Sequence, residues 1–148
     1  MNAFVRPLQE SDHDQWHKLW DGYLTFYETV LPTQQTELTW QRLLEPNFGI
    51  DGLVAEVDGR VVGFAHYSRT ASTWSARGDI YLEDLFVDTE VRGQGLGRKL
   101  ILALSDLAKS EGARKVYWQT HQGNATARKL YDSVGQLSEF VIYTRPAS

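Results

Sequence analysis

Three glycines fall within five residues in the segment Arg92-Gly93-Gln94-Gly95-Leu96-Gly97, between a predicted strand and a predicted helix. Glycine lets the backbone approach a ligand closely and turn its N–H groups toward it. The start of a helix adds about half a positive charge at the same place. The segment therefore predicts a binding site for an anion.

The spacing of the glycines separates this loop from two nucleotide-binding loops. A Walker loop needs Gly-x-x-x-x-Gly-Lys-Ser/Thr, whereas Gly97 is followed by Arg98 and Lys99 with no hydroxyl residue for magnesium. A dinucleotide fingerprint needs Gly-x-Gly-x-x-Gly, whereas the chain has Gly-x-Gly-x-Gly. Neither loop fits, and a strand-to-helix turn without a ligand is the structural alternative.

The elements that must position this loop follow from hydropathy and from Gly and Pro positions. Apolar residues from Trp16 to Tyr27 form a helical stripe that Ser11 or Asp12 can cap and Pro32 ends, and the pair Asp58-Gly59 between two apolar runs predicts a hairpin. Four helices are predicted. The first carries that stripe, the second covers about 36–45, the third runs from the glycine loop to Gly112, and the fourth covers 124–134. The predicted strands are 3–6, 53–57, 60–67, 79–87, 115–120 and 138–144, with a loop over 68–78.

The order strand, glycine loop, helix, strand predicts a crossover, so part of the sheet should be parallel, while the hairpin supplies an antiparallel part. With 148 residues and no linker or repeat, we expect a single domain over 1–148.

Composition excludes several classes of protein. No apolar run approaches the roughly 20 residues that span a bilayer, and no signal-peptide segment or cysteine is present, so we expect a cytoplasmic protein without a membrane role. A net charge of −4 argues against nucleic acid as the main partner. His13 and His17 have helical metal spacing but lack the Glu of the H-E-x-x-H signature, so we expect no metal.

The glycine loop after Leu85-Phe86-Val87 resembles motif A of the GCN5-related N-acetyltransferases, Gln/Arg-x-x-Gly-x-Gly/Ala. The run from Tyr81 to Val87 is similar to the Tyr-Leu-Glu-Asp-x-x-Val of the spermidine/spermine and yeast histone/polyamine or D-amino-acid branch, and 124–135 resembles its Asn-x6-Tyr-x3-Gly element. The resemblance covers nearly the whole chain. It implies an α+β fold with a mixed, mostly antiparallel sheet of about six to seven strands and about four helices.

The resemblance also implies acetyl-CoA as the co-substrate. The residues that it assigns to cofactor binding are Leu85, Phe86, Val87, Arg92, Gly93, Gln94, Gly95, Leu96, Gly97, Arg98, Asn124 and Tyr131. Asn124 has an alternative role as a helix N-cap.

Acetylation of an amine requires removal of a proton from a group with a pKa of about 10.4. By the resemblance Glu83 is the base, directly or through a water, and its alternative role is only to attract a cationic substrate. Because strand side chains alternate, Glu83 and Asp84 should face opposite sides, so that only one reaches a given cleft, and Asp84 is the alternative substrate anchor. Tyr131 is the expected proton donor to the leaving thiolate, with core packing as its alternative.

The acceptor site is expected around Glu28, Trp74, Glu83 and Asp84, while Tyr23 and Tyr27 lie on the core stripe and His66 and His121 are expected to be structural. Arg69 and Arg77 in the loop over 68–78 would favour an acceptor that bears a carboxylate. The expected activity is transfer of acetyl to a primary amine of an amino acid, polyamine or peptide in a ternary complex, by an enzyme that is a homodimer if it follows its relatives. The alternatives are a non-catalytic acyl-CoA sensor or interaction module, and a protein-lysine or aminoglycoside acetyltransferase.

Overall fold

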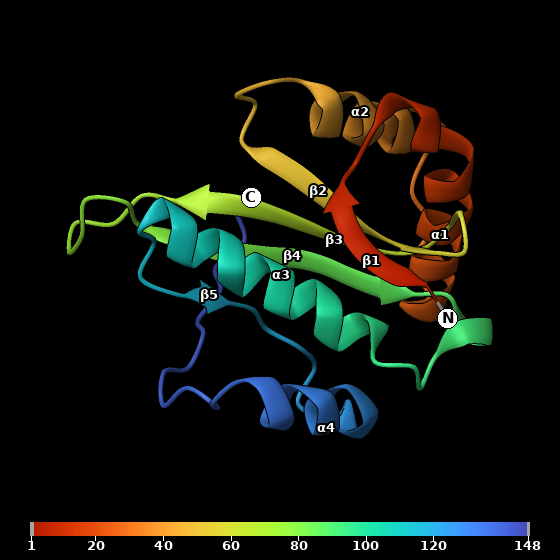
Figure 1. Ribbon diagram of the computed structural model, residues 1–148. Coiled ribbons are helices and arrows are strands. Elements are labelled where there is room, and N and C mark those ends of the chain that lie inside the picture. The colour runs from red at the N-terminus through yellow and green to blue at the C-terminus, as the bar shows by residue number, and fades with distance from the viewer. Residues whose placement is uncertain (1, 148) are drawn as a thin grey trace. The chain divides into compact units, whose positions relative to one another are not determined.

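The computed structural model describes residues 2–147, which divide into two compact units that meet between Trp118 and Gln119. The first unit is built on a five-stranded sheet whose strands lie side by side in chain order (Figure 1). The first four strands are antiparallel, and the last pair is parallel. The strands are β1 (Ala3–Pro7), β2 (Ile50–Val57), β3 (Arg60–Thr70), β4 (Asp79–Val87) and β5 (Val116–Tyr117).

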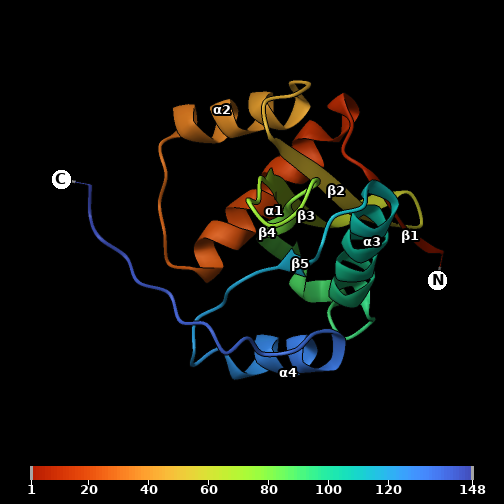
Figure 2. The same ribbon diagram turned by 90° about the vertical axis from the view of Figure 1, so that its left-hand side faces the viewer.

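Helices cover both faces of this sheet. On one face α1 (His13–Phe26) packs against β3 and β4, and α2 (Thr33–Leu44) packs against β2. On the other face, opposite α1 in Figure 2, lies α3 (Leu96–Glu111), which contacts all five strands. Two short 3-10 turns, η1 (Glu10–Asp12) and η2 (Thr89–Val91), precede α1 and follow β4. Within residues 2–147, no helix has both the length and the apolar character needed to cross a bilayer.

The second unit contains α4 (Ala125–Val134). Among residues 2–147, the four α-helices and the mostly antiparallel mixed sheet confirm the predicted fold class, but the sheet has five strands and not six or seven. The predicted strand over 138–144 is wrong, because residues 136–147 are in neither helix nor strand. Hydropathy shows that a segment can form a strand, but a strand also needs a neighbour that pairs with its backbone, which hydropathy does not show. The predicted strand over 115–120 shortens to β5.

Two apolar layers hold β3 and β4 in place. The stripe of α1 buries Trp16, Leu19 and Trp20 against Phe64 and Phe86, and α2 adds two more apolar side chains to the same layer. On the opposite face α3 buries its leucine stripe, of which Leu100 and Leu104 are completely inaccessible. Because interiors of this kind are close-packed, the central strands form a rigid base for the side chains described next.

Candidate active site

A β-bulge interrupts the ladder between β3 and β4 at Glu83. Tyr67 is paired with Leu82 and the preceding residue, His66, is paired with Asp84, so Glu83 is one extra residue on β4. A bulge of this kind bends the strand and breaks the alternation of its side chains.

Both carboxylates of the bulge face the same side of the sheet. Ser68 of β3 is near enough to Glu83 to lower its pKa, and Asp84 contacts His66, two residues earlier on β3. Residues two apart on a regular strand share a face, so Ser68 and His66 lie on one face of the sheet. The carboxylates of Glu83 and Asp84, which are next to them, lie on that face as well. The prediction that Glu83 and Asp84 face opposite sides is therefore wrong, because strict alternation holds only for an uninterrupted ladder.

The environment of Glu83 raises the pKa of its carboxyl group above the ordinary value. Partial burial raises the pKa of Glu83, and the negative charge of Asp84 raises it further. The side chain of Ser68 lowers the pKa, but the net shift is upward. A carboxylate with raised proton affinity is better matched to the role of a general base near neutral pH.

Asp84 is held by donors on both of its oxygens. The Tyr23 hydroxyl donates to Oδ1 at 2.6 Å, and a ring nitrogen of His66 lies 2.9 Å from Oδ2. The side chain remains 24% exposed, so Asp84 is accessible from solvent while its position is fixed. The sequence placed Tyr23 in the core stripe and gave no sign of this contact, because the pair is separated by 61 residues.

The outer edge of β4 is open next to the bulge. Among the described residues, β5 pairs with β4 only at Ile80–Val116 and Tyr81–Tyr117. Past Tyr81 no described strand continues the ladder, so the backbone from the bulge to Val87 has one edge available for a ligand. This edge includes Leu85, Phe86 and Val87, the strand residues assigned to the cofactor.

The glycine loop has the backbone conformation that its glycines permit. Gly93 and Gly95 have φ values of 83° and 76°, and a Cβ at either position would meet nothing within 4 Å. The need for glycine is therefore conformational and does not come from crowding. Gly95 is the N-cap of α3 and has no side chain to cap the amides of the first turn. Those amides and the open space fit a pyrophosphate group.

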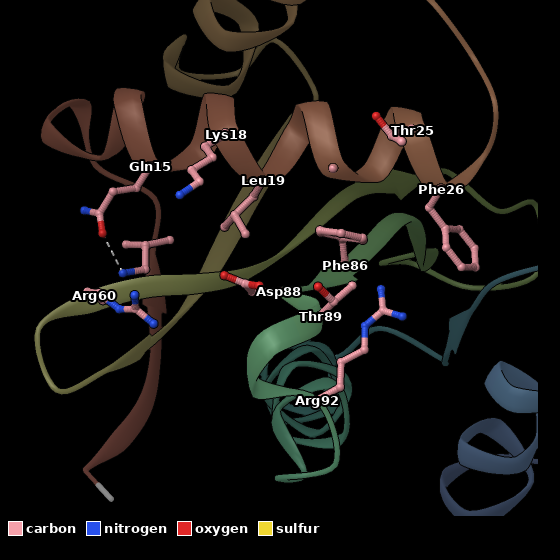
Figure 3. Close-up of a pocket in the computed structure, with 12 residues that line it drawn as sticks. Gln15, Lys18, Leu19, Thr25, Phe26, Arg60, Phe86, Asp88, Thr89 and Arg92 are labelled. Atoms are coloured by element: carbon pink, nitrogen blue, oxygen red, sulfur yellow. Dashed lines mark hydrogen bonds between the residues drawn. The ribbon is translucent and has the colours of Figure 1, made fainter.

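Arg92 directs its guanidinium away from the glycine loop (Figure 3). Its Nε donates to the Val87 carbonyl at 3.1 Å, and the guanidinium lies over the rings of Phe86 and Phe26 at 5.3 and 5.6 Å from their centroids. It lines a cavity of about 580 Å³ between α1 and the end of β4, together with Lys18 and Arg60. The side chain of Arg92 thus braces the loop against α1, and its backbone is what lies in the loop.

The predicted acceptor residues outside the bulge lie in the two segments that follow β3 and α1. Trp74 is 86% exposed in the loop after β3, and Glu28 follows α1 with a positive φ of 52°. Arg69 forms ion pairs with Glu111 at 2.6 Å and with Asp51 at 2.8 Å. Because these carboxylates neutralise Arg69, its charge does not support the expectation of a carboxylate-bearing acceptor.

In the second unit, Asn124 caps α4. Its Oδ1 accepts a hydrogen bond from the Ala127 amide at 3.2 Å, and its Nδ2 donates to Thr120 Oγ1 at 3.4 Å. Tyr131 lies two turns further along, which puts both residues on one side of the helix. This side is the half-buried face of α4, to which Ala127, Leu130 and Val134 also belong.

The mixed sheet, with a glycine-capped helix after a bulged, open-edged strand, offers a strand edge and helix amides that suit a ligand bearing a pyrophosphate. Residues 14–135 match the family described as the Acetyltransferase (GNAT) family. The chain is 34% identical over 143 residues to the D-amino-acid N-acetyltransferase HPA3 of Saccharomyces cerevisiae, which covers 95% of this chain and 89% of that protein. It is 39% identical over 75 residues to a thialysine N-epsilon-acetyltransferase of Bos taurus, covering 51% and 44%.

Among solved structures, an aminoglycoside acetyltransferase, AAC(6')-Iy with a CoA-containing bisubstrate analogue, has the same fold, with a TM-score of 0.85, 20% identity and full coverage of both chains. The chain belongs to the GNAT family. It is an acetyl-CoA-dependent N-acetyltransferase that acts on amines, and the glycine loop and helix start described above suit its co-substrate.

Proposed function

We propose that this enzyme transfers acetyl directly from acetyl-CoA to the primary amine of a small amino-acid acceptor in a ternary complex. The observation that carries the proposal is the bulge, which gathers the carboxylates of Glu83 and Asp84 on one face beside the open edge of β4. Two adjacent carboxylates attract an ammonium group and provide an acceptor for its proton. Two relatives named for D-amino acids and for thialysine support an amino acid over a polyamine.

Each of these groups has a separate role in the proposed reaction. Acetyl-CoA supplies an activated acetyl thioester. Asp84 anchors the ammonium, and Glu83 takes its proton directly or through a water, which leaves a neutral amine. Backbone N–H groups near Phe86 and Val87 stabilise the negative charge that develops on the thioester oxygen. The loop from Arg92 to Arg98 binds the pyrophosphate through backbone amides.

The acceptor class is tested by measuring CoA release with a panel of D- and L-amino acids, diamino acids, polyamines, aminoglycosides and histone peptides. We expect the highest kcat/KM among the amino acids. Preferential turnover of spermidine, an aminoglycoside or a peptide would contradict the proposed acceptor class. Binding of acetyl-CoA without CoA release for any acceptor would instead favour the sensor.

Tyr131 is proposed as the proton donor to the leaving CoA thiolate. A thiol has a pKa of about 8.5 and a tyrosine of about 10, so the phenol is still protonated when the thiolate departs. We expect Tyr131→Phe to lower kcat at least about tenfold while acetyl-CoA still binds, as measured by steady-state kinetics and calorimetry. Tyr27→Phe, at a partly exposed ring at the end of α1, is the matched control. Unchanged turnover in Tyr131→Phe would remove the residue from this role.

Assembly, location and domain organisation are part of the same proposal. The segment after α4 exposes Leu137, Phe140, Val141, Ile142 and Tyr143, an apolar surface suited to contact with a second copy, which supports a homodimer. Light scattering on the purified protein measures this directly. One family match that spans the boundary at Trp118 supports a single acetyltransferase domain, and the need for acetyl-CoA supports a cytoplasmic location.

A further inference from the structure

Four polar side chains form a continuous hydrogen-bonded series beneath the carboxylate pair. The Trp16 indole nitrogen lies 3.0 Å from His66 Nε2, and His66 Nδ1 lies 2.9 Å from Asp84 Oδ2. The Tyr23 hydroxyl reaches the other oxygen of Asp84 at 2.6 Å. Trp16 is completely inaccessible and His66 is 1% exposed, so the series runs from the core of the protein to the accessible Asp84.

The chemistry of these groups fixes the direction of every hydrogen bond. An indole N–H can only donate, so His66 Nε2 must accept from Trp16 and carries no proton. The ring proton of His66 is therefore on Nδ1, from which it donates to Asp84. The Tyr23 hydroxyl donates to the same carboxylate. Asp84 thus receives a donor on each oxygen, an arrangement that suits the ionised carboxylate.

The ring of His66 has little freedom to turn. It stacks on Phe64 with centroids 4.4 Å apart and planes 16° apart, and it contacts the rings of Trp16 and Trp20. A histidine that only filled space here would bury two polar nitrogens at a cost, which an apolar residue would avoid. Because both nitrogens are used and the series ends at an accessible carboxylate, the arrangement specifies the position of Asp84 and not only the packing of the core.

We propose that Trp16, His66 and Tyr23 are positioning residues that hold Asp84 as a fixed anion beside Glu83, so that the acceptor ammonium is anchored with its proton directed to the base. This inference deepens the proposed function and rests on the assignment of Asp84 and Glu83 to the acceptor amine. Trp16 has the most distant role, since its N–H selects the ring form of His66 that can donate to Asp84.

The charge of Asp84 has a second consequence for Glu83, because it helps to keep the pKa of Glu83 above its ordinary value. Replacing Asp84 with Asn removes that charge and lowers the pKa of Glu83. The acid limb of the kcat/KM profile should then move to lower pH, even though the KM for the amine rises. The groups that face the two carboxylates are Tyr23 from α1, His66 and Ser68 from β3, and Tyr81 from β4, with Tyr117 of β5 behind Tyr81.

The first test uses the whole protein labelled with 15N-histidine. Ring nitrogen shifts distinguish a proton on Nδ1 from one on Nε2. At pH 7 we expect His66 to have its proton on Nδ1, which does not depend on whether Glu83 is the base. A signal from His66 with the proton on Nε2, or with both nitrogens protonated, would overturn the proposal.

The second test compares Tyr23→Phe with Tyr27→Phe, which removes the same hydroxyl one helical turn later from a ring that contacts Tyr23. Loss of the hydrogen bond to a charged group should lower kcat/KM for the amine about tenfold in Tyr23→Phe, mainly through KM, with the KM for acetyl-CoA unchanged. Tyr27→Phe should stay within about twofold of the parent enzyme. Equal kinetics in the two variants would overturn the positioning role. Failure of Glu83 as base would appear separately, as full activity in Glu83→Gln.

Discussion

Replacing Glu83 with Gln should lower kcat/KM for the amine at pH 7 by about 100-fold or more, which is the contribution typical of a positioned general base. The amide keeps the size and polarity of the side chain but cannot take a proton from the ammonium. The KM for acetyl-CoA should remain within about twofold, because the donor binds through the glycine loop in the proposed assignment. Steady-state kinetics with each substrate varied in turn measures both quantities.

The pH dependence of kcat/KM provides a second test of the role of Glu83. The pKa of Glu83 is raised, so the base form increases as the pH rises through that pKa, and the parent enzyme should show an acid limb there. Glu83→Gln should lack this limb, and its deficit should shrink as the pH approaches the pKa of the acceptor amine. Glu45→Gln, at an exposed carboxylate at the end of α2, is the control. A variant at Glu83 with more than half of the parent activity at pH 7 would show that the base lies elsewhere.

A Gly95→Val substitution should raise the KM for acetyl-CoA by about 30-fold. Gly95 has a φ of 76°, and a β-branched residue in this conformation costs about 1–2 kcal/mol or more, so the loop should abandon the geometry that presents its amides. A Cβ there meets nothing within 4 Å, so the effect comes from conformation and not from a clash.

The hairpin provides a matched control for Gly95→Val. Gly59 has a φ of 84°, and a Cβ there also meets nothing within 4 Å, but it lies in the turn between β2 and β3. Gly59→Val should lower the melting temperature about as much as Gly95→Val does, because both substitutions strain a residue with positive φ. The KM for acetyl-CoA should stay at the parent value in Gly59→Val. An equal rise in KM for both variants would mean that general strain, and not the loop, controls donor binding.

Much of the fold follows from local sequence signals. The Asp58-Gly59 turn has positive φ at both residues, as a type I′ hairpin requires, so that prediction is confirmed. The helical stripe is buried from Trp16 to Trp20 as its spacing predicts, whereas Tyr27 at its end is 47% exposed. Helix α3 begins within the glycine segment, at Leu96, and has Gly112 as its C-cap in left-handed conformation. These features depend on residues close together in the chain, and propensity and periodicity capture them well.

The arrangement of the candidate site depends on contacts between distant residues. No local pattern predicts that one residue would be inserted at Glu83, because a bulge is visible only when the register against β3 is known. The role of His66 was missed for the same reason, since its partners Trp16 and Asp84 are 50 and 18 residues away. The available signal was weak: a histidine among the apolar residues of a buried strand needs polar partners.

The bulge at Glu83 also limits how the site can be transferred to another protein. Copying Glu83 and Asp84 onto an uninterrupted antiparallel sheet would place one carboxylate on each face, since side chains of a regular strand alternate. A designer would need to insert a residue opposite the position of His66 as well as to choose the two acids. The site in this strand therefore depends on an inserted residue as well as on the two acids. A comparison of residue types at aligned positions does not reveal such an insertion.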